Sequence, residues 1–439
     1  MGLFRAYDLR GIYPDEINDK VAERLGKALG TFLQGRETVC IGYDTRASSK
    51  KIFKSFASGL ASTGCEVISL GLVPNPLVYF YSWSKKIFGC LITGSHNPKQ
   101  WTGLKLVKPN GTSFLEEIET VKKIFEEGNF LKGCGKVIDA SILQQYENFL
   151  ERNFGKLKAK VVVECFGGAG VKAVSILKSL GLEVIALHDK SSATFYGFER
   201  PEPKGKNLLQ LMRRVKWAKA DFGVAFDGDA DRAVFVDNKG RELNGSIMSA
   251  IFIPAVLQKK KGKIILTADC ASELKRIVER YGGELIWWRV GHGFIEKKCL
   301  EESALFAGEQ SSHFYFNEFY PFSDGILATV YLASILSGKK LSSLVDRVKL
   351  HPTEKLYINV KSDEKKGRIV EELKKEFPKA IDIMDGIKIE LNKVEWVLIR
   401  ASQTLPEINI CAEGKTKARL KSIVSKYSKI VKEKLMSYG

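Results

Sequence analysis

The chain has 439 residues, of which 44% are hydrophobic and 27% charged, a composition typical of a globular protein with several domains. No segment reaches the roughly 18 uninterrupted apolar residues of a membrane span, and the first residues lack the apolar region of a signal peptide. We therefore expect a cytoplasmic protein with no membrane partner. The net charge of +18 favours anionic ligands, either nucleic acid or small phosphate esters. The eight cysteines form no C-x-x-C pair, which favours reduced, mostly buried thiols.

One pattern of elements occurs three times along the chain. Strand-like segments begin at Thr38, Val161 and Lys263, and each is followed by a helix-like stretch, a glycine and a second strand-like segment. Because a strand, a helix and a parallel strand form a βαβ unit, the repetition predicts three related α/β domains. The helix-like stretches are Lys50–Ser62, Val171–Leu180 and Ser272–Tyr281.

The pattern changes after Leu350. Expected strands and helices there predict an α+β domain with an antiparallel sheet and helices on one face. The predicted fold class is thus α/β with four domains around a central cleft, at residues 1–138, 139–240, 241–350 and 351–439. The expected strands are His351–Val360, Ile387–Leu391 and Trp396–Ile399, and the expected helices Gly367–Phe377 and Thr416–Leu435.

A polar loop, Thr93 to Pro98 (TGSHNP), follows the apolar run Phe88–Ile92. The glycine allows a tight turn and the proline prevents a helix from starting at once, so the hydroxyl of Ser95 is presented on a loop. A serine hydroxyl becomes a good nucleophile only beside a base or a metal. An ordinary polar turn is the alternative interpretation.

The segment Asp227-Gly228-Asp229-Ala230-Asp231-Arg232 places three carboxylates at alternate positions. They would repel one another without a cation, and hard oxygen ligands suit Mg²⁺. An EF-hand is excluded, because Arg232 stands where its loop requires a glycine and Asn238 where it requires a glutamate. The sequence therefore predicts a magnesium loop between two strands.

Three weaker motifs follow. Glu309, Ser311 and His313 alternate in GEQSSH and could bind sugar hydroxyls, and His292 lies in a glycine turn after a strand. Near the C-terminus, an arginine, two hydroxyls and an amide could hold a phosphate; these residues are Arg400, Ser402, Gln403 and Thr404.

Together these motifs resemble the α-D-phosphohexomutase family, most closely its phosphomannomutase/phosphoglucomutase branch. Five motifs occur in the same order over essentially the whole chain: FRAYDLRG, TGSHNP, DGDADR, GEQSSH and RASQT. The resemblance implies an isomerase that interconverts hexose 6-phosphate and hexose 1-phosphate, with Mg²⁺ and a hexose 1,6-bisphosphate that acts as intermediate and activator. It implies hexose phosphates as small-molecule partners, no nucleic acid, and a monomer or homodimer.

The resemblance also assigns roles to residues. It makes Ser95 the phosphoserine, with Asp227, Asp229 and Asp231 and a Ser95 phosphate oxygen as the magnesium ligands. Tyr7, Arg10 and His96 would line the phosphoserine, and Lys105 would be the general acid and base. Arg232, His292, Glu309, Ser311 and His313 would bind the sugar, while Arg400, Ser402, Gln403 and Thr404 would bind the phosphate that is not transferred.

Three positions depart from the family pattern. Gln403 replaces an asparagine, Ala271 a lysine, and Cys411 a basic residue in the strand of Arg400. Losing a cation should weaken substrate binding and leave phosphoryl transfer intact, and Arg289 is a possible substitute. Three alternatives remain: a phosphoglucosamine mutase, suggested by Gln310, a non-catalytic sugar-phosphate-binding paralogue, and a nucleic-acid binder suggested by the charge.

Overall fold

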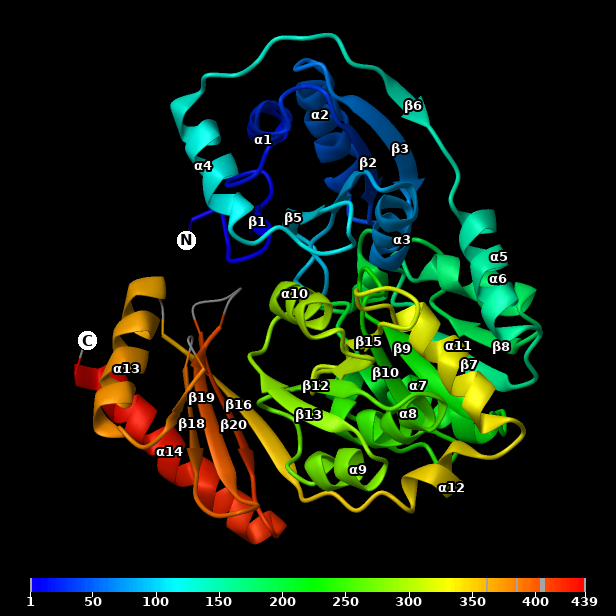
Figure 1. The fold of residues 1–439 in the computed structure, drawn as a ribbon, viewed down its shortest axis with the longest axis vertical. Coiled ribbons are helices and arrows are strands. Elements are labelled where there is room, and N and C mark those ends of the chain that lie inside the picture. Colours follow the sequence, from blue (N-terminus) through cyan, green and yellow to red (C-terminus); the bar gives the residue numbers. More distant parts are fainter. Residues whose placement is uncertain (1, 361, 384–385, 403–406, 438–439) are drawn as a thin grey trace.

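The computed structural model describes residues 2–360, 362–383, 386–402 and 407–437. Four sheets succeed one another along the chain. In Figure 1 the first domain, blue to cyan, lies above the second and third, which are green to yellow and lie side by side. The fourth domain, orange to red, lies beside the third and below the first.

The first sheet has the strand order β1-β5-β4-β2-β3-β6. Strands β2 and β3 run parallel with α2 between them, which confirms the first predicted βαβ unit. The elements are β1 (Leu9–Ile12), α1 (Asp19–Phe32), β2 (Thr38–Tyr43), α2 (Ser49–Ala61), β3 (Glu66–Leu72), α3 (Asn75–Lys85), β4 (Phe88–Ile92), β5 (Trp101–Val107), α4 (Glu117–Glu127) and β6 (Val137–Asp139).

The second sheet has the order β11-β10-β9-β7-β8, and its predicted βαβ unit is β7-α6-β8. The predicted metal loop joins β9 to β10, which pair antiparallel. The elements are α5 (Leu143–Phe154), β7 (Lys160–Glu164), α6 (Val171–Ser179), β8 (Glu183–Leu187), η1 (Phe195–Gly197), η2 (Gly205–Leu208), α7 (Leu209–Trp217), β9 (Phe222–Phe226), β10 (Ala233–Asp237) and β11 (Glu242–Leu243).

The third sheet has the order β13-β12-β14-β15, with β12 and β13 parallel around α9. All three predicted βαβ units are therefore present. The elements are α8 (Gly245–Lys259), β12 (Lys263–Thr267), α9 (Leu274–Arg280), β13 (Glu284–Trp288), α10 (His292–Glu302), β14 (Phe306–Gly308), β15 (Phe314–Phe316), α11 (Gly325–Leu336) and α12 (Leu341–Val345).

The fourth sheet is antiparallel throughout, in the order β16-β20-β19-β18-β17. The prediction of helices on one face is confirmed by α13 and α14, which cover the same side in Figure 1. Cys411 was expected in the strand of Arg400 but lies on β20, because the chain reverses after β19. The elements are β16 (Thr353–Asn359), α13 (Asp363–Glu376), β17 (Ile381–Asp382), β18 (Gly386–Glu390), β19 (Trp396–Ala401), β20 (Glu407–Glu413) and α14 (Lys417–Ser437).

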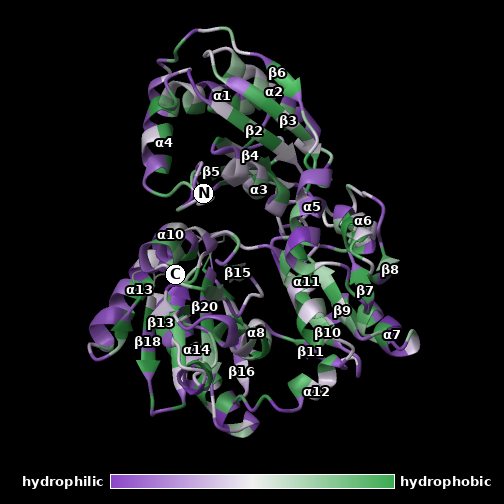
Figure 2. Cartoon of the chain, turned by 45° about the vertical axis from the view of Figure 1, so that its right-hand side comes forward, coloured by the Kyte–Doolittle hydropathy of each residue, from purple (hydrophilic) through white to green (hydrophobic). Residues whose placement is uncertain are grey.

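The cores show how the domains are joined. One large hydrophobic cluster includes side chains from the first three domains, whereas the fourth domain has its own. A small cluster of Ala268, Trp396, Leu398 and Cys411 connects the fourth domain to the third. Figure 2 shows green strands inside and a largely purple α13 outside, as burial of apolar surface requires.

Two expectations from composition can be compared with the structure. All eight cysteines are free thiols and only Cys134 is exposed, which confirms the prediction of mostly buried thiols. Within the described ranges, no helix combines the length and the apolar character that crossing a bilayer requires.

Candidate active site

The loop after β4 holds Ser95 in an uncommon backbone conformation. Ser95 is 3% exposed and has a φ of 48°, in the left-handed region that residues other than glycine rarely adopt. The guanidinium of Arg46 fixes this conformation, because it donates hydrogen bonds to the carbonyl oxygens of Ser95 and Asn97, both at 2.7 Å. Position 94 has to be glycine, since a Cβ on Gly94 would lie 2.4 Å from Arg46 Cζ.

Asp227, Asp229 and Asp231 form a buried group of carboxylates after β9, whose potential ligand oxygens lie within 4.8 Å of one another. Burial, followed by repulsion from the charges of Asp231 and Asp229, raises the pKa of Asp227 well above its ordinary value. Asp229 Oδ1 is buried and accepts no hydrogen bond from the described residues. Crowded and incompletely paired carboxylates of this kind fit a hard divalent cation such as Mg²⁺.

The serine loop and the carboxylate loop come from different domains and are in contact. Ser95 Oγ donates a hydrogen bond of 3.1 Å to Asp227 Oδ2, across 132 positions of sequence. Gly228 permits this approach, because a Cβ there would lie 2.3 Å from the carbonyl oxygen of Ser95. The structure thus brings the hydroxyl and the carboxylates together, as the sequence predicts.

Lys105 lies on β5 and is 2% exposed. Its Nζ is 2.6 Å from Asp231 Oδ2 and 2.8 Å from Asp229 Oδ2. Burial by itself would lower the pKa of Lys105, but the charges of Asp229 and Asp231 raise it above its ordinary value. The ammonium is therefore protonated and neutralises part of the carboxylate charge.

His96 and Arg10 flank the serine loop. His96 Nδ1 lies 3.3 Å from Ser95 Oγ. Burial, and then the charges of two nearby arginines, lower the pKa of His96 well below its ordinary value, so the ring is neutral. Arg10 is buried and donates to Asp8 Oδ2 at 2.7 Å and to the carbonyl oxygen of Thr93 at 3.4 Å.

The loop between β14 and β15 brings three polar side chains to the carboxylate group. His313 Nε2 lies 3.3 Å from Asp231 Oδ1, and its Nδ1 lies 3.2 Å from Glu309 Oε1. Burial opposes protonation, but Glu309 and Asp231 raise the pKa of His313 to about 9. Burial acts to raise the pKa of Glu309, but His313 together with Tyr315 and His292 lowers it to about 2. Ser311 Oγ lies 3.0 Å from His313 Nδ1, and Arg232 Nε lies 3.3 Å from His313 Nε2.

His292 is the first residue of α10 and lies near His313, with the two ring centroids 6.3 Å apart. Its Nδ1 is 3.3 Å from Glu296 Oε1. Tyr7 contacts His292 edge to face with ring centroids 4.5 Å apart, and it also contacts Phe294. Tyr7 therefore lies between the first and third domains, and its role beside the phosphoserine stays a prediction.

The predicted phosphate cradle is described only in part. Arg400 ends β19 and is 6% exposed. Burial raises the pKa of Tyr7 above its ordinary value, and the positive charge of Arg400 acts in the opposite direction. Ser402 is buried, and its carbonyl oxygen accepts a hydrogen bond from Lys366 Nζ at 2.6 Å. Gln403 and Thr404 lie outside the described residues.

Three residues that support the site, Asp44, Arg46 and Asn75, are absent from the sequence prediction. Asp44 accepts hydrogen bonds from Arg46 Nε at 3.0 Å and Thr93 Oγ1 at 2.8 Å. Asp44 and Arg46 follow directly after β2, at the carboxyl end of a parallel strand, where functional residues are common in α/β proteins. This position is the sequence signal by which both residues could have been predicted. Asn75, at the start of α3, donates its backbone N–H to the carbonyl oxygen of Asp229 and its amide to Asp231 Oδ2. No sequence signal marks Asn75.

Two of the three departures from the family pattern, Cys411 and Ala271, lie near the contact between the third and fourth domains, where the backbone N–H of Ser272 also donates to Glu413 Oε2; Gln403 lies outside the described residues. Cys411 packs against Ala268, and the backbone N–H of Ala271 donates to Ser246 Oγ. Arg289, the suggested substitute cation, lies 3.7 Å from the ring centroid of Phe294.

Gln310 connects domains. Its amide oxygen accepts hydrogen bonds from the N–H and hydroxyl of Ser246, and its amide nitrogen donates to Thr353 Oγ1 at 3.1 Å. The side chain of Gln310 therefore joins the third domain to the fourth, whereas the side chains of Glu309 and His313 contact each other.

Known proteins match the chain over nearly its full length. Sequence models for α/β/α domains I, II and III of phosphoglucomutase/phosphomannomutase match residues 1–132, 141–240 and 244–351. A phosphomannomutase/phosphoglucomutase of Pseudomonas syringae pv. tomato is 33% identical over 96% of this chain and 93% of its own. A probable phosphoglucosamine mutase of Methanosphaera stadtmanae is 34% identical over 96% of each chain.

A solved structure extends the comparison to the fold. The crystal structure of a phosphoglucomutase/phosphomannomutase family protein from Burkholderia thailandensis superimposes with a TM-score of 0.88 at 28% identity, over 98% of this chain and 97% of the other. Three matching domains, a relative above 30% identity and a shared four-domain fold agree with the geometry of the serine and aspartate loops. The chain therefore belongs to the phosphoglucomutase/phosphomannomutase family of α-D-phosphohexomutases, which are isomerases of hexose phosphates.

Proposed function

We propose that the protein interconverts the 6-phosphate and 1-phosphate of mannose, glucose or both, through a phosphorylated Ser95 and a hexose 1,6-bisphosphate. The observation that carries the proposal is the 3.1 Å contact between Ser95 Oγ and Asp227 Oδ2. It brings a nucleophile of the first domain and the carboxylate group of the second to one point, where neither loop could act alone.

The residues around Ser95 suit phosphoryl transfer, which depends mainly on positioning and on neutralising charge. The phosphoryl group leaves Ser95 Oγ and bonds to the free hydroxyl of the hexose phosphate. Lys105 is charged and buried beside the carboxylates, so it can give a proton to the serine oxygen and take one from the sugar hydroxyl. After the bisphosphate has turned around, its other phosphate returns to Ser95.

Asp227, Asp229 and Asp231 are the residues that would hold Mg²⁺, together with an oxygen of the Ser95 phosphate. Their burial, spacing and mutual repulsion fit such an ion. When bound, the ion supplies positive charge beside the transferred phosphoryl group. Asn75 and Gly228 keep the carboxylate loop in place for this task.

The sugar would lie between the transferred and the fixed phosphate. Arg232, His292, Glu309, Ser311 and His313 supply donors and acceptors near the carboxylates, as described above. On the C-terminal sheet, Arg400, Ser402, Gln403 and Thr404 would hold the other phosphate. We retain the domain limits 1–138, 139–240, 241–350 and 351–439, and a monomer or homodimer, as parts of the proposal.

A phosphoglucosamine mutase is the second candidate, because a relative of that name is as similar as those of the phosphomannomutase branch. Gln310 gives it little support, since its side chain contacts Ser246 and Thr353. Initial rates on mannose 1-phosphate, glucose 1-phosphate and glucosamine 1-phosphate, with bisphosphate activator and Mg²⁺, separate the two candidates.

The proposal is tested on Ser95 itself. After incubation with glucose 1,6-bisphosphate, mass spectrometry should find one phosphate on Ser95, and Ser95→Ala should abolish turnover. Ser58→Ala, on the exposed side of α2, is the control and should keep full activity. An unphosphorylated Ser95 in a protein without mutase activity would favour a non-catalytic sugar-phosphate-binding protein.

A further inference from the structure

One row of side chains crosses the inner face of the C-terminal sheet. Arg400 on β19 pairs with Asn409 on β20, and Asn409 pairs with Tyr357 on β16. Because cross-strand partners point to the same side, the three side chains share one face. Cys411, two residues beyond Asn409, packs against Ala268 of the third domain, so this is the face turned toward the other domains.

Asn409 lies in the middle of the row, and among the described residues its side-chain oxygen accepts no hydrogen bond. The residue is 6% exposed, and its Oδ1 is buried. Buried side-chain amides nearly always have a partner in a folded protein, and an exception calls for an explanation. The two amide atoms are interchangeable by a flip of the side chain, so Asn409 can present either an acceptor or a donor to a ligand.

Lys204 of the second domain contacts Tyr357, the residue at the β16 end of this row. Lys204 Nζ lies 3.4 Å from the hydroxyl of Tyr357 and 4.6 Å from its ring centroid. Lys204 forms no ion pair with a carboxylate of the described residues, although its charge acts on the nearby Glu242 and Glu407 and opposes the rise in their pKa that burial causes. Lys204 and Tyr357 are both exposed, so the ammonium is accessible to a ligand.

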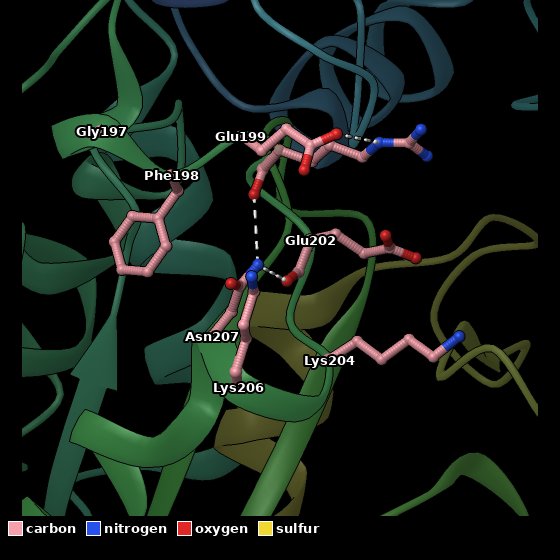
Figure 3. A pocket seen from close by; sticks show the side chains of 8 residues that line it. Gly197, Phe198, Glu199, Glu202, Lys204, Lys206 and Asn207 are labelled. Atoms are coloured by element: carbon pink, nitrogen blue, oxygen red, sulfur yellow. Dashed lines mark hydrogen bonds and ion pairs between the residues drawn. The ribbon is translucent and has the colours of Figure 1, made fainter.

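The loop that carries Lys204 begins beside the carboxylate loop of Asp227, Asp229 and Asp231. Pro201 packs against Gly228 of the carboxylate loop, so closely that a Cβ on Gly228 would lie 3.0 Å from Pro201 Cγ. Residues of this loop also line a cavity of about 600 Å³ in the second domain. In Figure 3 the side chains of Glu202 and Lys204 extend to the same side, away from Phe198. The loop thus runs from the carboxylate group to the fourth domain.

We propose that Lys204 and Asn409 extend the phosphate site of Arg400 and bind the phosphate that is not being transferred. The inference rests on the proposed function and adds two residues to it. An arginine, an amide and an ammonium along one row offer several donors to one tetrahedral anion. Strand spacing puts the ends of the row about 10 Å apart, within reach of the long side chains of Arg400 and Lys204.

The subsite contains side chains from two domains, so binding of phosphate depends on how these domains are arranged. Lys204 belongs to the second domain and Asn409 to the fourth, so the full set of donors forms only while the two domains lie together. A phosphate bound there favours that arrangement, because it gains contacts that the separated domains do not offer. The site would therefore help to retain the bisphosphate while it turns around.

Binding to a protein that cannot turn over tests the inference. Calorimetric titration of Ser95→Ala with glucose 1-phosphate in the presence of Mg²⁺ gives the reference affinity. Adding Lys204→Met keeps the aliphatic contact with Tyr357 and removes the charge, and the affinity should fall about tenfold or more, as loss of a charge-assisted hydrogen bond predicts. Lys204→Arg should retain most of the affinity. Lys206→Met, which alters another lysine lining the same cavity, should bind within about twofold of the reference.

Asn409→Asp tests the second residue, since it keeps the shape of the side chain and adds a charge that repels phosphate. It should weaken binding of glucose 1-phosphate at least as much as Lys204→Met does, with circular dichroism confirming the fold. Unchanged affinity of both variants overturns the inference, as does a lower melting temperature of Lys204→Met with unchanged affinity, because Lys204 would then only connect the domains. If wild-type protein turns over and these variants bind normally, only the inference fails. If the reference protein does not bind and the wild type is inactive, the proposed function fails as well.

Discussion

Arg46 offers the most direct test of how the structure prepares Ser95. Its side chain and that of Asp44 are at most 1% exposed, and its Nε lies 3.0 Å from Asp44 Oδ2. Arg46→Met leaves the carboxylate of Asp44 buried without its cation, which costs about 3–5 kcal/mol of unfolding free energy. For a domain of this size, that loss should lower the melting temperature by roughly 10 °C.

The same substitution should impair catalysis. Without the guanidinium, the carbonyl oxygens of Ser95 and Asn97 lose their donor, and the left-handed conformation of Ser95, which costs of order 1–3 kcal/mol, is no longer held. The loop then relaxes and Ser95 Oγ moves away from Asp227. A displacement of about 1 Å can cost roughly 100-fold in rate, so we expect at least that loss in kcat.

Arg46→Lys separates stability from positioning. A lysine retains a positive charge beside Asp44 but lacks the fork that reaches several carbonyl oxygens at once. Its melting temperature should lie between those of wild type and Arg46→Met, while kcat stays low. Thermal melts by circular dichroism and a glucose 1-phosphate mutase assay measure both, with the exposed Arg36→Met as control. Wild-type kcat in Arg46→Lys would refute the positioning role, and an unchanged melting temperature in Arg46→Met would refute the estimate of the buried charge pair.

Three further predictions concern the carboxylate group and its surroundings. Asp229→Asn, or removal of metal with EDTA, should lower the mutase rate by orders of magnitude, and readdition of Mg²⁺ should restore the rate of the wild type only. Gly228→Ala should also lower kcat, because its Cβ would lie 2.3 Å from the carbonyl oxygen of Ser95 and push the two loops apart; an active variant with unchanged kinetics would contradict this close approach. The third prediction is a pH dependence of the metal-free protein: the pKa of His313 is raised to about 9, so its stabilising contribution is complete below pH 6.5 and is lost as pH rises through 9. Thermal melts between these pH values should show the decline, and His313→Gln should reduce it.

Local sequence patterns were sufficient for much of the fold. Strand and helix periodicities with a glycine between them identified all three βαβ units, since hydrogen bonding and side-chain alternation within such a unit depend on neighbouring residues. In the fourth domain the antiparallel sheet was predicted, but β20 was missed as a separate strand, and Cys411 was therefore assigned to the wrong one. Its pairing with β19 and β16 depends on residues far apart along the chain.

The chemical groups of the site were also evident from the sequence. The alternating carboxylates of Asp227, Asp229 and Asp231 repel one another in any fold and therefore require a cation. The loop sequence around Ser95 presents a hydroxyl beside a histidine, which is the arrangement a nucleophilic serine needs. Such arguments depend on charge and on covalent spacing, which the sequence contains.

Only the tertiary structure decided which groups act together. It placed Ser95 beside Asp227, Arg46 under the serine loop, Asn75 against Asp229 and Lys204 on Tyr357. It also directed Gln310 away from the sugar-binding side chains and toward the fourth domain. These contacts join residues from different domains or distant loops, and they are fixed by how whole sheets and helices pack around shared cores, for which a single sequence gives no local signal.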